Sequence, residues 1–139
     1  TEIPVAKEGG AYLTVRDEDK EELVPVAREL ESMGFAIYAT PGTADVIRAN
    51  EIDVQTVYRI NDRLHPDALD LMRRGQVSFI VNVPTISGGA VRDGNMMRRL
   101  AVEMNIPFVT TMSGAVMEVA AIKANREVDL VPMRLTVNY

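Results

Sequence analysis

Short apolar segments of strand length alternate with segments of helical spacing along most of the chain, and this alternation limits the folds open to it. The segment from Val77 to Val81 is apolar almost throughout, as expected of a strand buried on both faces. Strands that alternate with helices are joined by right-handed crossovers, which produce a parallel sheet covered on both faces. We therefore predict an α/β fold, a three-layer, doubly wound sheet of five parallel strands.

The predicted elements follow one another in a simple order. Strands are expected at residues 11–15, 35–39, 54–57, 77–81 and 106–109. Helices are expected after a cap at Asp17 as far as Gly34, from Thr43 to about Asn50, from Pro66 to Arg74, from about Asp93 to Asn105, and over a last segment with Val116, Val119 and Ile122.

Length and composition exclude several classes of protein. The 139 residues fit a single domain, with residues 1–9 as a linker and residues 126–139 as a tail that is either an edge strand or a connection out of the domain. The chain has no cysteine, which excludes disulfides and thiolate metal sites and fits a cytoplasmic protein. The net charge of -5, with its basic residues dispersed, argues against a nucleic-acid partner, and no segment is long enough to span a membrane. The first residue, Thr1, suggests a piece of a longer protein.

The turn after the second predicted strand is a candidate anion site. Thr40 ends the strand, a Pro-Gly turn follows, and Thr43 is a good N-cap for the next helix. Gly42 has no side chain that would keep a ligand away from the backbone. The start of a helix attracts phosphate or carboxylate through its unpaired N–H groups. A tight turn that binds nothing explains the same residues, and both interpretations stay open.

Lys20 is unusual because it falls in the first turn of the first predicted helix, where the helix dipole disfavours a cation. A bound anion would compensate for this position, and so would an ion pair with Asp17. We favour the anion.

Polar side chains follow the other strands, and in doubly wound sheets ligands bind beyond the carboxyl ends of the strands. Arg59 offers a planar fork that suits phosphate, and Asn82 offers a donor and an acceptor that suit a base or ribose, or a cap of its own loop. The remaining polar residues at these ends are Thr14, Arg16, Thr110 and Thr111.

Candidate catalytic groups are few. The single histidine, His65, precedes Pro66 at a helix start and is interpreted as a surface or capping residue. The pair Asp93-Gly94 is interpreted as a helix-entry turn. No nucleophile–base pair and no metal cluster stands out, so no catalytic residue, metal site or cofactor is predicted within this domain.

Four segments together carry a resemblance to a known family. They are residues 13–20, 34–44, 93–99 and 105–111, within a similarity that covers residues 10–124. They resemble the C-terminal regulatory domain of carbamoyl-phosphate synthase large subunits, which belongs to the methylglyoxal-synthase-like superfamily. The resemblance implies a domain that binds a nucleotide effector such as UMP or IMP and passes the signal to the synthase domains of the same large subunit.

The same resemblance implies what kind of enzyme such a domain belongs to. The parent enzyme would be a glutamine-hydrolysing ligase with a glutaminase small subunit, and it would use ATP with Mg or Mn to make carbamoyl phosphate for pyrimidine and arginine biosynthesis.

The resemblance also assigns roles by position. The effector phosphate would be held by Lys20, Thr40, Gly42, Thr43 and Arg59, and the rest of the nucleotide by Thr14 and Asn82. A second effector or interface site, where some bacterial members bind ornithine, would involve Phe108, Thr110 and Thr111.

The chain departs from the family pattern at two of these positions and at Pro84. Arg59 replaces a usual lysine, Pro84 replaces a hydroxyl residue, and Phe108 replaces a tyrosine. The substitution by Pro84 bears on the identity of the effector, because proline donates no hydrogen bond.

Two other functions are compatible with parts of the sequence. Methylglyoxal synthase, a phospholyase that acts on dihydroxyacetone phosphate, would use the same phosphate site. It needs a Gly-Asp motif after the third strand and a histidine after the fourth, where this chain has Asn61-Asp62 and Ala90. A domain that serves only as an oligomer interface would not need the polar strand ends. The regulatory interpretation is therefore preferred.

Overall fold

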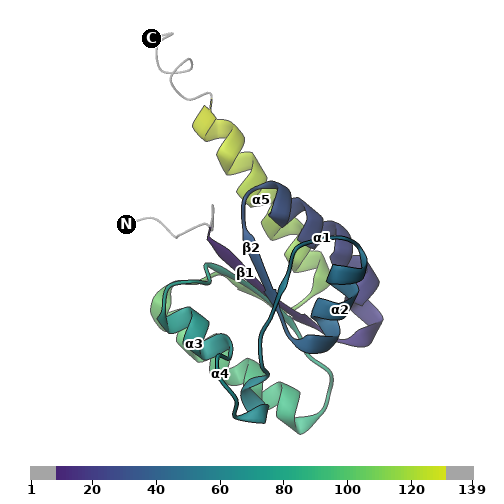
Figure 1. The fold of residues 1–139 in the computed structure, drawn as a ribbon. Helices are drawn as coiled ribbons and strands as arrows, with labels where there is room; N and C mark the ends of the chain where they lie inside the picture. The colour runs from purple at the N-terminus through teal and green to yellow at the C-terminus, as the bar shows by residue number, and fades with distance from the viewer. Residues whose placement is uncertain (1–8, 131–139) are drawn as a thin grey trace.

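The computed structural model describes residues 9–130, which form a parallel sheet of five strands with helices on both faces (Figure 1). The strands are β1 (Gly10–Val15), β2 (Ala36–Ala39), β3 (Gln55–Thr56), β4 (Phe79–Val83) and β5 (Phe108–Val109). The helices are α1 (Lys20–Ser32), α2 (Pro41–Ala49), α3 (Ala68–Arg73), α4 (Gly88–Met104) and α5 (Met112–Leu130), with single 3₁₀ turns η1 (Asp17–Asp19) and η2 (Ile60–Asp62).

The strand order is β3-β2-β1-β4-β5, and every pair of neighbours is parallel. The chain builds outward from β1 through β2 to β3, and then crosses to the other side of β1 to add β4 and β5. The direction of winding thus reverses between β1 and β4. This arrangement confirms the predicted fold class.

Two apolar clusters lie on opposite faces of the sheet. Helices α1, α2 and α5 cover one face and α3 and α4 cover the other (Figure 1). The alternation of side chains along β1 serves both clusters, because Leu13 joins the first and Tyr12 the second. Within residues 9–130, no helix combines the length and apolarity that a membrane crossing requires.

Four helix starts differ from prediction. Helix α1 begins at Lys20 with Asp19 at its N-cap, so the prediction that Asp17 caps this helix was wrong, and Asp17 opens the 3₁₀ turn η1 instead. Helix α2 begins at Pro41 with Thr40 as its N-cap, so the prediction that Thr43 is the N-cap was wrong. Proline is favoured in the first turn because it has no N–H to leave unpaired there. Helix α3 begins at Ala68, since Asp67 forms a capping box with Asp70.

Helix α4 shows the largest difference, because it begins at Gly88 rather than near Asp93. The predicted glycine-rich loop is its first turn, and Asp93-Gly94 lies inside the helix, so the helix-entry interpretation was wrong. A β-carbon at Gly89 would stand 2.9 Å from the side-chain amide nitrogen of Asn61. Glycine is poor in helix interiors, but here it allows the helix start to approach η2 closely.

Strand boundaries and the predicted tail also differ. Strands β3 and β5 have two residues each, and β4 extends to Val83, so Asn82 lies within this strand. Helix α5 continues through Leu130, where the first part of the tail was expected. Lys123 pairs with Glu29 of α1 at 3.3 Å, and the Arg126 guanidinium lies 5.7 Å from the centre of the Phe35 ring. These contacts support the helix beyond the sheet. Residues 1–8 of the linker and 131–139 of the tail lie outside the described residues.

Candidate functional site

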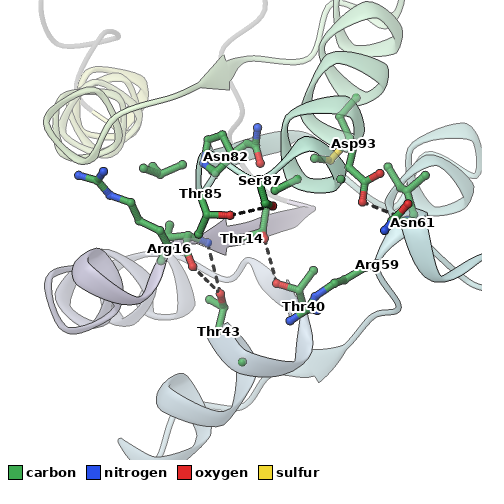
Figure 2. A pocket seen from close by; sticks show the side chains of 18 of the residues that line it. Thr14, Arg16, Thr40, Thr43, Arg59, Asn61, Asn82, Thr85, Ser87 and Asp93 are labelled. Atoms are coloured by element: carbon green, nitrogen blue, oxygen red, sulfur yellow. Dashed lines mark hydrogen bonds between the residues drawn. The ribbon is translucent and has the colours of Figure 1, made fainter.

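A cavity of about 430 Å³ lies at the carboxyl ends of the central strands, where the direction of winding reverses (Figure 2). All seven residues predicted to bind phosphate or nucleotide line it. They are Thr14, Lys20, Thr40, Gly42, Thr43, Arg59 and Asn82. The sheet topology therefore brings together residues that are up to 68 positions apart in the sequence.

Three polar side chains reach the cavity because of the two-residue repeat of strands. Thr14, Thr40 and Asn82 each follow by two positions a residue of the cluster under α3 and α4, so they face the same side of the sheet. Thr14 and Asn82 are partners in the register of β1 and β4, and the Thr14 and Thr40 hydroxyl oxygens lie 2.9 Å apart. Tyr12 lies beneath them, and burial, followed by the charge of Asp93, raises the pKa of its phenol.

Thr43 attaches the first turn of α2 to the end of β1. Its side-chain oxygen lies 3.3 Å from both the backbone nitrogen and the backbone oxygen of Val15, and the residue is 2% exposed. This hydroxyl therefore completes hydrogen bonds that the backbone of β1 lacks at its end.

Lys20 lies against this same corner. Its ammonium donates to the backbone oxygen of Val15 at 2.8 Å and to the Asp17 carboxylate at 2.7 Å. A β-carbon at Gly42 would stand 3.5 Å from Cε of Lys20, so the glycine leaves room for the lysine beside the first turn of α2. Of the two compensating groups considered for Lys20, the ion pair with Asp17 is present in the structure. The third N–H of the ammonium has no protein partner within residues 9–130.

Arg59 precedes η2 and lines the cavity, with its side chain extended toward Thr40 (Figure 2). It is exposed and forms no ion pair with any of the residues that the structure describes. Its guanidinium is therefore available to an anionic ligand.

Asp93 is a cavity residue that the sequence analysis missed. Its carboxylate accepts the backbone N–H of Asn61 at 3.0 Å, which joins α4 to η2 (Figure 2). Burial raises the pKa of Asp93 above the ordinary value, against the lowering effect of this hydrogen bond. Thr85 and Ser87, 3.2 Å apart at their hydroxyl oxygens, also line the cavity and were not predicted. A helix start placed at Gly88 would have indicated Asp93, because it lies one and a half turns into α4 on a partly buried face.

The residues of the predicted second site lie outside this cavity. Phe108 packs against the cluster under α3 and α4, and Thr110 is exposed. The Thr111 hydroxyl accepts the backbone N–H of Gly114 at 3.0 Å at the start of α5. The structure thus gives Phe108 and Thr111 structural contacts, and an effector or interface role for the three stays a prediction.

His65 lies at the surface beside the start of α3, as one of the two interpretations of the sequence expected, and the capping residue of this helix is Asp67. The side chain is 69% exposed, and its Nδ1 lies 2.6 Å from Oδ2 of Asp70. The Asp67 and Asp70 carboxylates each accept the other's backbone N–H at 3.0 Å. Possible metal-ligand atoms of these three residues lie within 4.8 Å of one another, but the capping hydrogen bonds account for their grouping. The hydrogen bond that Asp70 accepts from the backbone N–H of Asp67 is the largest cause that lowers the pKa of Asp70. The hydrogen bond from the His65 ring and the charge of His65 lower this pKa further.

Comparison with known proteins decides the family. The profile of the MGS-like domain matches residues 22–110, which include Thr40, Gly42, Thr43, Arg59 and Asn82. The chain belongs to the MGS-like domain family.

Relatives of this MGS-like domain include far longer proteins. It is 39% identical over 126 residues to the carbamoyl phosphate synthase large chain, C-terminal section, of Methanopyrus kandleri, and 43% identical over 124 residues to that of Methanocaldococcus jannaschii. These alignments cover 91% and 88% of this chain but 23% and 19% of the relatives, so the chain spans about a fifth of their length. They confirm the resemblance found in the sequence.

A solved structure supports the fold assignment. Methylglyoxal synthase from Elizabethkingia anophelis NUHP1 superposes with a TM-score of 0.59 over 83% of this chain and 79% of that chain. The sequence identity is 14%, so this likeness bears on the fold alone.

Proposed function

We propose that this MGS-like domain is the regulatory domain of a carbamoyl phosphate synthase large chain, and that its cavity binds a nucleotide effector of the UMP or IMP type. The observation that carries the proposal is the convergence of Lys20, Gly42 and Arg59 with the hydroxyls of Thr14 and Thr40 on one cavity. Its volume of about 430 Å³ falls in the range of small-molecule sites.

The effector phosphate would lie at the first turn of α2. The unpartnered N–H of Lys20 and the backbone N–H groups near Gly42 would donate to it. Thr14 and Thr40 share one hydrogen bond between their hydroxyls, which leaves one hydroxyl proton of the pair to donate to the ligand. Arg59 and Asn82, which also line the cavity, would hold the rest of the nucleotide.

Regulation would require that the effector bind two states of the whole enzyme with unequal affinity. In a protein of the relatives' length, the synthase domains and their ATP with Mg or Mn would lie outside this chain, and the glutaminase would be a separate subunit. Such an enzyme would work in the cytoplasm and supply carbamoyl phosphate to pyrimidine and arginine biosynthesis.

Isothermal titration with UMP, IMP and inorganic phosphate tests the proposal. We expect at least one of the nucleotides to bind, and Lys20→Ala to weaken its binding by about ten- to one hundredfold, because a hydrogen bond to a charged group is lost. The control is Lys123→Ala, which removes a lysine that pairs with Glu29 away from the cavity. Absence of heat with all three ligands would contradict the proposed function. Equal affinity in the Lys20→Ala variant would contradict the phosphate site.

The phospholyase function is less well supported by the cavity. Of the residues in the described range, no histidine lines it, and its carboxylates are Asp17 and Asp93. Asp93, with its raised pKa, is the side chain that an acid–base reaction in this cavity would use. We expect no methylglyoxal from dihydroxyacetone phosphate; turnover that is lost in Asp93→Asn would instead support an enzyme.

A further inference from the structure

The ion pair between Asp17 and Lys20 places a negative charge at the proposed phosphate site. Asp17 lies in η1 and lines the cavity, and its side chain is 95% exposed, whereas that of Lys20 is 14% exposed. The carboxylate is 2.7 Å from the ammonium, on the same residue that the ligand phosphate would approach.

The neighbouring cation, Arg16, is not free to neutralise the charge of Asp17. Arg16 also lines the cavity, but its guanidinium donates to Asp19 at 2.8 Å. The turn between β1 and α1 therefore pairs each of its cations with an acid three residues away. Both cations on this side of the cavity are partly neutralised before a ligand arrives.

Lys20 itself does not depend on Asp17 for its position. The ammonium also donates to the backbone oxygen of Val15 at 2.8 Å, and the side chain lies beside Gly42. An amide in place of the carboxylate would still accept from the ammonium, so Asp17→Asn removes charge while it keeps the hydrogen bond.

We propose that Asp17 lowers the affinity of the cavity for dianionic ligands by competing for Lys20, and so sets the effector concentration to which the domain responds. This inference rests on the proposed function and names a residue that tunes it. The Asp17 carboxylate repels a phosphate dianion that binds to the same Lys20 ammonium, and this repulsion weakens binding. An uncharged ligand is not repelled.

The test compares three proteins by isothermal titration with UMP, uridine and inorganic sulfate at about pH 7.5, where a phosphate monoester is largely a dianion. The proteins are the parent, Asp17→Asn and Glu18→Gln. Glu18 is the matched control because it is exposed in the same 3₁₀ turn, does not line the cavity, and its substitution changes the net charge by the same amount. Both variants lose one negative charge just before α1, so any effect of that loss on the helix dipole is common to both.

We expect Asp17→Asn to tighten binding of UMP by about fivefold at low salt, with the effect shrinking as salt is added. Binding of sulfate should tighten as well, uridine should be unaffected, and Glu18→Gln should match the parent. Equal affinities for UMP in all three proteins, or weaker binding in Asp17→Asn, would overturn the role of Asp17 and leave the proposed function intact. If UMP binds to none of the three proteins and IMP does not bind to the parent either, both the role of Asp17 and the proposed function are overturned.

Discussion

Gly94 shows how one residue without a side chain shapes the cavity. It lies in α4, and a β-carbon at this position would stand 2.5 Å from the side-chain amide nitrogen of Asn82. The buried Asn82 amide can occupy its present place in the cavity wall only because this position carries no side chain.

We expect Gly94→Ala to move the Asn82 amide into the cavity. The free energy of unfolding should change by less than about 1 kcal/mol, because the displaced group is the end of a side chain and alanine favours the helix. Binding of UMP, measured by titration, should nevertheless weaken. The control is Gly88→Ala in the first turn of the same helix, where a β-carbon would meet nothing within 4 Å. Unchanged binding in Gly94→Ala would show that Asn82 does not contribute to the site.

At the scale of single residues, the sequence indicated which residues are unusual for their position but not which contacts they make. The conflict between the charge of Lys20 and the helix dipole was visible in the sequence, and the structure does place Lys20 in the cavity. Its contact with the backbone oxygen of Val15 was not visible, because the path of the backbone beyond a strand is not encoded in a local pattern. Asp93 was missed for a related reason, because the side of the helix on which its side chain lies depends on where α4 begins.

Two titratable side chains at the start of α3, His65 and Asp70, have pKa values shifted in opposite directions. The hydrogen bond and charge of Asp70 raise the pKa of His65 above the ordinary value of 6.5. This contribution to stability is complete below the unfolded pKa and is lost as the pH rises through the folded pKa. The pKa of Asp70 is lowered from 3.8, so its contribution is present above that value and is lost as the pH falls through the folded pKa.

We therefore expect both contributions to be present together between about pH 4 and pH 6.5. Denaturation by urea should show that His65→Gln lowers the free energy of unfolding more at about pH 5.5 than at about pH 8.5, because glutamine cannot gain the charge. The chain has no other histidine, so between about pH 5.5 and about pH 8.5, above the titration of Asp70, the parent and the variant should differ through His65 alone. Parallel pH profiles for the two proteins would contradict this role of His65.

At the scale of elements, the order and type of strands and helices followed from the sequence, and their boundaries did not. The apolar segment from Val77 was predicted as a strand, but β4 begins at Phe79. Helix α4 begins at Gly88 although glycine disfavours helices, and its second residue, Gly89, is where close packing against Asn61 of η2 requires a small residue. Tertiary contacts of this kind override local preference and cannot be read from one segment.

For the whole molecule, the central sheet connects the two apolar clusters. Adjacent residues of β1 contribute to opposite clusters, as Tyr12 and Leu13 do. Loss of packing on one face therefore weakens the strand that the other face needs. We expect the described residues to unfold as one cooperative unit.

The variant Met72→Ala tests this cooperativity. Met72 is fully buried in the cluster under α3 and α4, so its truncation should cost about 2–5 kcal/mol. Thermal transitions followed by far-ultraviolet and tyrosine circular dichroism should fall together. Met117→Ala is the control, because that side chain is 72% exposed and should change stability by less than about 0.5 kcal/mol. Separate transitions for the two signals in Met72→Ala would show that the faces unfold independently.

The cavity has a buried floor and an exposed rim. Tyr12 lies in the packed interior, whereas Arg59, Asn61 and Ser87 stand on exposed turns above it. Substitutions at such surface positions usually change stability by less than about 0.5 kcal/mol. A few substitutions at the rim would therefore suffice to change which ligand the proposed site accepts, while the scaffold beneath remains under a separate and stricter selection.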